Sequence, residues 1–232
     1  MRIDKVAKER HYFIAGTDTG VGKTLVSTAL LHQFAATGLR AVGMKPVASG
    51  AVLHAGRWCN DDVSALRAAS NVPVPYALDN PYLFREATAP HLAAEDERVH
   101  IDLLHIKCCY EALLDHADTV IVEGVGGLLV PLNDYACTDD LAVLLGLPVI
   151  LVVGIRLGCI NHALLTVRAL SAKGLILAGW VASTLDPDML QLPATLDCLR
   201  NRIPAPLLGC VPYLRNPDAS SAAQFLDLAP LD

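Results

Sequence analysis

Short uninterrupted runs of apolar residues recur along the chain and alternate with longer segments whose apolar positions are three or four residues apart. The short runs predict buried strands, and the spaced segments predict helices. We expect strands at residues 11–15, 41–47, 119–122, 148–153, 175–181 and 207–211. The strand at residues 41–47 is expected to run into a functional turn, because Pro46 cannot donate to a central ladder. We expect helices at residues 22–36, 60–69, 101–116, 138–145, 161–172 and 188–202.

Strands that alternate with helices indicate βαβ units joined by right-handed crossovers. Continuous apolar runs are typical of strands that helices cover on both faces. The sequence therefore predicts an α/β fold of three layers, with a mostly parallel central sheet flanked by helices. The strand order does not follow from the sequence. Residues 49–57 are expected to form a loop. The proline-rich residues 71–92 are expected to form a long irregular connection, which is usually either a binding loop or an excursion over the surface.

The length of 232 residues suits one large domain, which we expect at residues 11–232. Residues 1–10 are rich in charge and are expected to be a disordered extension. This extension lacks the apolar segment of a signal peptide.

The net charge of −6 argues against a nucleic-acid partner. The longest uncharged run, residues 141–155, is shorter than the ~18–20 residues that a membrane span needs, so no membrane partner is expected. The cysteine count of seven is odd and includes no C-x-x-C pair, which is typical of free thiols in a reducing compartment. These features predict a cytoplasmic protein.

Residues 16–24, with the sequence GTDTGVGKT, lie between the first predicted strand and the first predicted helix. Glycines in such a turn let backbone N–H groups converge on a phosphate, and the helix N-terminus adds positive potential. Lys23 is placed to reach the terminal phosphates, and the Thr24 hydroxyl to face Mg²⁺. The motif departs from G-x-x-x-x-G-K-[ST], because Thr17 replaces its first glycine and Gly16 comes one position early. We interpret it as a variant P-loop; the alternative is an ordinary glycine-rich turn.

Further polar residues follow the other predicted strands, and ligands of parallel sheets gather at these carboxyl ends. Glu123 follows an apolar strand and is a candidate magnesium ligand, with Asp62 as a second candidate and Asp61 competing for the same role. Lys45 either extends its charge to solvent from a buried strand or stabilises charge in a transfer reaction.

The residues 158–161 open a predicted helix, so their N–H groups either hold a carboxylate or form a plain turn. Cys159 has no visible base beside it, which argues against a nucleophile and favours a buried thiol.

Together, several motifs in this order resemble the dethiobiotin synthetase family. The matching segments are residues 16–24, 45–50, 80–82, 87–91, 123–127, 157–163, 178–182 and 203–209. The resemblance extends from Tyr12 to about Pro217. It implies a P-loop NTPase-type fold and an ATP-dependent ligase of biotin biosynthesis.

In this family, 7,8-diaminononanoate takes up CO₂ as an N-carbamate, whose oxygen attacks the γ-phosphate of ATP. The second amine displaces phosphate from the mixed anhydride and closes the ring of dethiobiotin, with ADP and phosphate as the other products. A carbamate and a phosphate are both anions, so cations must offset their repulsion. The resemblance also implies Mg²⁺ as a cofactor, ATP as co-substrate and a homodimer with the substrate at its interface.

The resemblance also implies roles for individual residues. The catalytic residues are Lys23, Lys45 and Thr19, and the magnesium ligands are Thr24, Asp62 and Glu123. The nucleotide contacts are these metal ligands together with Thr19, Gly20, Val21, Gly22, Lys23, Gly124, Gly126, Ser183, Val211, Pro212 and Tyr213. The substrate contacts are Thr19, Lys45, Ser49, Gly158, Cys159 and Asn161, with the 158–161 turn coming from the partner subunit.

One position departs from the family pattern. Ser183 stands where the family often has an asparagine that recognises adenine. A serine lacks the paired donor and acceptor of an amide, so we expect relaxed base selectivity.

The alternatives to a dethiobiotin synthetase are another P-loop ATPase, such as a cobyrinate-amidase-like synthetase domain or a switch ATPase, and a catalytically silent nucleotide-binding module. The chain shows neither a glutaminase cysteine and histidine nor a basic face, and the presence of Lys23, Thr24, Lys45 and Glu123 together argues against a silent module.

Overall fold

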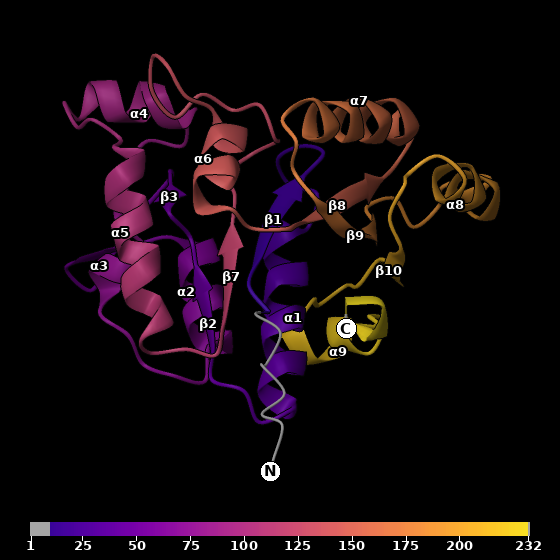
Figure 1. Ribbon diagram of the computed structural model, residues 1–232, viewed down its shortest axis with the longest axis horizontal. Coiled ribbons are helices and arrows are strands. Elements are labelled where there is room, and N and C mark those ends of the chain that lie inside the picture. Colours follow the sequence, from indigo (N-terminus) through magenta and orange to yellow (C-terminus); the bar gives the residue numbers. More distant parts are fainter. Residues whose placement is uncertain (1–9, 232) are drawn as a thin grey trace, which may run out of the picture.

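The computed structural model describes residues 10–231, so most of the predicted extension at residues 1–10 lies outside the described residues. A six-stranded sheet lies at the centre of the molecule, with helices on both faces (Figure 1). Its strand order is β10-β9-β8-β1-β7-β2, and every pair of neighbours is parallel. The predicted three-layer α/β fold is therefore confirmed, and the structure adds the strand order.

The strands of this sheet are β1 (Tyr12–Gly16), β2 (Ala41–Met44), β7 (Thr119–Glu123), β8 (Val149–Ile155), β9 (Leu177–Thr184) and β10 (Leu207–Val211). The long helices are α1 (Lys23–Ala36), α2 (Asp61–Ala69), α5 (Leu103–Leu114), α6 (Thr138–Leu145), α7 (Cys159–Ala172) and α8 (Leu192–Arg200). Successive side chains of a strand point to opposite faces, so β1 contributes Phe13 to one apolar core and Ile14 to the other. The core with Phe13 includes residues of α5, α6, α7 and α8, and the core with Ile14 includes residues of α1, α2 and the short α9 (Ala219–Ala223).

The strand predicted at residues 41–47 divides after Met44. Pro46 has no N–H to donate to a central ladder, and the chain leaves the sheet there. Residues Val47–Ala48 (β3) pair instead with Tyr82–Leu83 (β6) in a separate two-stranded sheet. The break places Lys45 just beyond the carboxyl end of β2.

Several loop predictions were wrong or incomplete. Residues 49–57 do not form a plain loop, because β4 (Val52–His54) and β5 (Arg57–Cys59) make an antiparallel hairpin. The connection at residues 71–92 contains α3 (Tyr76–Asp79), β6 and the start of α4 (Pro90–Asp96). The helix predicted from Asp188 begins only at Leu192, after Gln191 adopts a left-handed backbone with φ 59°. Residues Ala229–Leu231 form a 3₁₀ turn that was not predicted.

The ends of the helices follow local chemistry. Asn60 rather than Asp61 caps α2, because its side-chain oxygen accepts a hydrogen bond from the Val63 N–H. Gly38 follows α1 with φ 88°, as expected for a glycine that ends a helix. Among residues 10–231, none of the helices combines the length and the apolar composition required to cross a bilayer.

Helix α5 offers a matched test of the packing. Leu113 is fully buried in the core against the sheet, whereas its neighbour Leu114 is 38% exposed. We expect Leu113→Ala to lower the free energy of unfolding by about 2–5 kcal/mol, because it removes buried methyl groups and leaves a cavity. Leu114→Ala is the control and should cost about 1 kcal/mol or less, since surface substitutions usually have small effects. Chemical denaturation measures both values, and equal losses would contradict this packing.

Candidate active site

The P-loop closes around the side chain of Lys23. Its ammonium group donates hydrogen bonds to the carbonyl oxygens of Asp18 (3.1 Å) and Gly126 (2.6 Å). A Cβ atom on Gly16 would lie 2.9 Å from the Val21 side chain and 3.0 Å from that of Lys23, so the close approach requires glycine. The variant loop thus needs its glycine at position 16, one residue before the usual place.

Residues at the carboxyl end of β8 make further contacts that stabilise the P-loop. The Arg156 guanidinium lies 2.7 Å from Oδ2 of Asp18, and Oδ1 of Asp18 accepts a hydrogen bond from the Thr19 N–H at 2.8 Å. Thr17, which stands where the usual motif has glycine, accepts a hydrogen bond from the Gly154 N–H at 3.3 Å. Arg156 was not among the predicted site residues. Its position shortly after the carboxyl end of a predicted strand was the only feature of the sequence that could have placed it near the site.

Four side chains from four elements meet beside the P-loop. The Thr24 hydroxyl lies 2.7 Å from Oδ1 of Asp62 and 2.8 Å from Oε1 of Glu123. The Lys45 ammonium lies 2.8 Å from Oδ2 of Asp62 and 2.6 Å from Oε1 of Glu123. It also donates to the Gly124 carbonyl at 3.3 Å. We call Thr24, Lys45, Asp62 and Glu123 the acid–lysine cluster.

Burial and charge set the protonation of this cluster. Burial disfavours the charged form of Lys45, but the carboxylates of Glu123 and Asp62 outweigh it and raise the pKa of Lys45 above its ordinary value. Burial likewise opposes ionisation of Asp62, yet the nearby Lys45 ammonium lowers the pKa of Asp62. Both groups are therefore charged at neutral pH.

Lys23 lies in a different environment. Burial and the repulsive charge of Lys45 lower the pKa of Lys23 to about 8, although three carboxylates act in the opposite direction. Its hydrogen-bond acceptors are neutral carbonyl groups. The charged form of Lys23 is therefore weakly stabilised by the protein alone, and an anion placed beside it would be strongly attracted.

The cluster has the features of a divalent-cation site. Oε2 of Glu123 is buried without a hydrogen-bond partner in the described part of the chain. Carboxylate and hydroxyl oxygens of Glu123, Asp62 and Thr24 converge there, and magnesium prefers such hard donors. Asp61, the competing candidate, is exposed in the first turn of α2 and pairs with none of these groups. The donor set therefore fits Mg²⁺.

A cavity of about 730 Å³ opens in front of the P-loop. This volume lies in the range of small-molecule sites. Residues that the sequence predicted for the site form much of its wall: Thr19, Gly20, Gly22, Lys23, Thr24, Lys45, Ser49, Asp62 and Gly126. Its other walls were not predicted as site residues: Ala48, Asn60, Ala87, Thr88, Ala89, Pro90, Val125 and Val130. Residues 87–90 belong to the long connection for which a binding loop was one of the two alternatives.

Other predicted site residues do not form part of this cavity's wall. Ser183, at the end of β9, packs behind the P-loop, where a Cβ on Gly22 would lie 2.6 Å from its hydroxyl. The Val21 and Val211 side chains are buried, whereas Tyr213 is half-exposed. The remaining predicted contacts outside the cavity wall are Glu123, Gly124, Pro212, Gly158, Cys159 and Asn161.

In the turn before α7, only some of the backbone N–H groups remain available to a ligand. The Cys159 side chain is buried in the core, and its N–H donates to the Arg156 carbonyl at 3.0 Å. Gly158 adopts φ 94°, which lets the chain turn into the helix. A ligand at this turn would meet the N–H groups of the next residues, Ile160 and Asn161.

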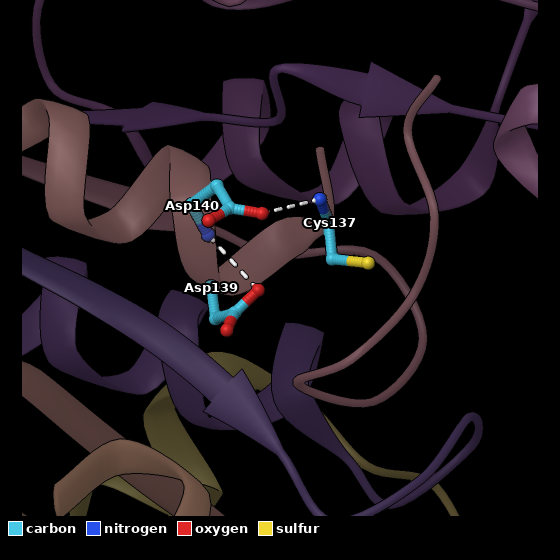
Figure 2. A group of neighbouring side chains, drawn as sticks. All are labelled: Cys137, Asp139 and Asp140. Carbon is cyan, nitrogen blue, oxygen red and sulfur yellow. Dashed lines mark hydrogen bonds between the residues drawn. The ribbon is translucent and has the colours of Figure 1, made fainter. Parts of the chain in front are cut away.

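A second acidic group, at the start of α6, has a structural explanation. The ligand atoms of Cys137, Asp139 and Asp140 lie within 4.8 Å of one another (Figure 2). Oδ2 of Asp140 accepts the Cys137 N–H at 2.7 Å, which caps the helix (Figure 2). Lys173 lies 3.2 Å from Asp139 and 2.5 Å from Asp140. The two acids therefore already have a cation.

Comparisons with known proteins identify the family and the fold of the chain. Residues 10–221 match the family model described as "AAA domain". The chain is similar to a protein of Aromatoleum aromaticum named ATP-dependent dethiobiotin synthetase BioD, with 53% identity over 96% of this chain and 99% of that protein. A protein of the same name from Janthinobacterium sp. is 52% identical over 94% of both chains.

Solved structures show the same fold at low identity. The MinD cell division protein of Aquifex aeolicus has a TM-score of 0.57 and 16% identity, covering 92% of this chain and 93% of its own. A ParA family ATPase of Chlorobium tepidum has a TM-score of 0.57 and 12% identity, covering 97% and 95%. These likenesses establish a P-loop NTPase fold, and the near full-length identity with the two synthetases establishes that the chain belongs to the dethiobiotin synthetase family.

Proposed function

We propose that the chain forms dethiobiotin from 7,8-diaminononanoate, CO₂ and ATP, and that residues 11–232 act as one catalytic domain. The observation that carries the proposal is the buried Lys45 ammonium, held between Asp62 and Glu123 beside Thr24 of the P-loop. A fixed cation next to a triphosphate cradle suits a reaction between two anions. The chain's place in the family supplies the identity of the substrates.

The two lysines stabilise negative charge at different places in the reaction. Lys23 lines the cavity from the P-loop and would meet the terminal phosphates, and Lys45 reaches the same cavity from the end of β2. The carbamate oxygen attacks the γ-phosphorus, and the bond to ADP breaks. The second amine then attacks the carbamoyl carbon, and phosphate leaves as the ring closes. Lys45 stabilises the charge on the carbamate and transferring phosphoryl oxygens, while Thr19 and Ser49 provide polar contacts for the diamine or carbamate.

Thr24, Asp62 and Glu123 are proposed to hold Mg²⁺. The unpartnered Oε2 of Glu123 and the converging oxygens support this assignment. When bound, the ion supplies positive charge to the phosphate oxygens. Lys45 keeps the two carboxylates partly neutralised, which limits the cost of burying Glu123.

A homodimer with the substrate at its interface completes the proposal. The turn at residues 158–161 of the partner would hold the substrate carboxylate through its N–H groups. Leu157, next to this turn, is 96% exposed in the single chain, so the turn lies at the surface, where a partner subunit could reach it. The MinD and ParA likenesses concern the fold alone, so they favour no switch function.

We expect Lys23→Ala and Lys45→Ala each to reduce kcat by about 10²–10³-fold, the usual effect of removing one preorganised donor. Formation of dethiobiotin, scored by mass with bicarbonate, Mg²⁺ and ATP, measures the loss. Lys107→Ala is the matched control, since this lysine is half-exposed and pairs with Glu111 on α5. Near-normal turnover in both site variants would defeat the assignment.

Asp62→Asn should raise the Mg²⁺ concentration for half-maximal activity by about tenfold or more, because it replaces a charged oxygen ligand with a neutral one. Asp61→Asn changes the neighbouring, exposed residue in the same helix turn and should leave this concentration unchanged. A magnesium titration of turnover compares the two variants. Equal shifts in both would assign the effect to the charge of the helix rather than to the metal.

Base selectivity is expected to be weak, because Ser183 is buried behind the P-loop and outside the wall of the cavity, where its short side chain offers a base at most a single contact. A single serine hydrogen bond is worth ~0.5–1.5 kcal/mol, so kcat/KM for ATP should exceed that for CTP or GTP by no more than about tenfold. Ser183→Asn should increase the preference for ATP, because an amide offers a donor and an acceptor. Ser183→Ala should abolish what preference exists. A wild-type preference for ATP of about a hundredfold or more would count against this role.

A further inference from the structure

Two consecutive residues hold the backbone of Lys45 from both sides. The Lys45 N–H donates to the Asp79 carbonyl at 2.8 Å. The Lys45 carbonyl accepts a hydrogen bond from the Asn80 side-chain amide at 2.7 Å. These bonds lie at the break between β2 and β3, where the sheet ladder no longer fixes the chain.

The chemistry of this position suits asparagine. Nδ2 of Asn80 also donates to the Tyr82 carbonyl at 3.1 Å, so its NH₂ group joins the segment before β3 to the first residue of β6. The residue is buried, with 8% of its surface exposed. An aspartate would present only acceptors to these two carbonyls, and an alanine would leave both of them without this donor.

Asp79 is fixed in turn by Arg67. The guanidinium Nε lies 2.7 Å from Oδ2 of Asp79, and Nη2 lies 2.6 Å from Oδ1, a bidentate pair with a buried carboxylate. The Arg67 guanidinium also lies over the Tyr76 ring, 4.0 Å from its centroid. Arg67 and Asp62 belong to the same helix, α2, so one rigid element sets the position of Asp62 and, through residues 79–80, that of Lys45.

We propose that Asn80, supported by the Arg67–Asp79 pair, is a positioning residue that sets the Lys45 ammonium for the reaction. The inference rests on the proposed function in one respect, the participation of Lys45. Loss of the Asn80 donor frees the Lys45 carbonyl at a point where Pro46 has no N–H, so the strand end relaxes. A displacement of about 1 Å at a reacting group costs ~10²-fold in rate.

The test compares the kinetics of Asn80→Ala, Lys45→Ala and the double variant. Asn80→Ala should lower kcat by about 10–100-fold while KM for ATP changes less than about threefold, since the P-loop is untouched. In the Lys45→Ala background, the same change should lower kcat by less than about threefold, because residues that act through one group are not additive.

Asn71 offers a matched control at the other end of β2. Its side chain accepts the Ala41 N–H at 2.7 Å and donates to the Leu39 carbonyl at 2.8 Å, so it fixes the same strand far from the cluster. Asn71→Ala should lower the melting temperature and leave kcat within about twofold of the wild type, as expected of a purely structural clamp.

Asn80→Ser retains one donor and should recover part of the activity lost in Asn80→Ala. If the alanine variant does not fold, as judged by circular dichroism and thermal melting, the serine variant carries the same comparison. Wild-type kcat in Asn80→Ala, or a full multiplicative loss in the double variant, overturns the inference alone. Wild-type kcat in Lys45→Ala would instead remove the role of Lys45, and with it this inference.

Discussion

The mutual burial of one ammonium and one carboxylate is the constraint on which the site depends. Glu123 is fully buried and Lys45 is 3% exposed, so either charge without the other would be costly in the interior. Their pairing requires the ends of β7 and β2 to lie side by side, which the parallel register of these strands provides. Asp62 and Thr24 then join the pair from α2 and α1. The site therefore depends on four elements that only the folded sheet brings together.

The irregular parts of the fold occur where this site is built. The chain leaves the central sheet at Pro46, and the bonds that a longer β2 would have made to β7 are replaced by bonds to residues 79–84. The P-loop likewise needs glycines at positions 20 and 22 in the left-handed region. The regular strands and helices position the site. The break in the strand at Pro46 and the left-handed glycines of the P-loop direct side chains and N–H groups toward the cavity.

The two lysines at the cavity are prepared differently. Lys45 is held charged by two carboxylates, whereas Lys23 meets carbonyl oxygens and has its pKa lowered to about 8. A lysine bound to carboxylates is a fixed cation whose position is set before any ligand arrives. A lysine bound to neutral acceptors can exchange them for phosphate oxygens at little cost, and its charge is strengthened by the anion it meets. The first arrangement suits orientation, and the second suits nucleotide binding.

Local pattern in the sequence determined the alternation of strands and helices, the P-loop with Lys23 and Thr24, and the position of Glu123 after a buried strand. These follow from residues within a few positions of one another, whose spacing and backbone preferences are readable along the chain. Only the tertiary structure decided the strand order, the meeting of Asp62 with Thr24 and Lys45, the ion pair of Arg156 with Asp18 and the hydrogen bond from Asn80 to Lys45. The side-chain contacts join residues 17 to 138 positions apart, and the strand order depends on which elements become neighbours. The spacing of side chains within one element does not specify which distant element will pack against it.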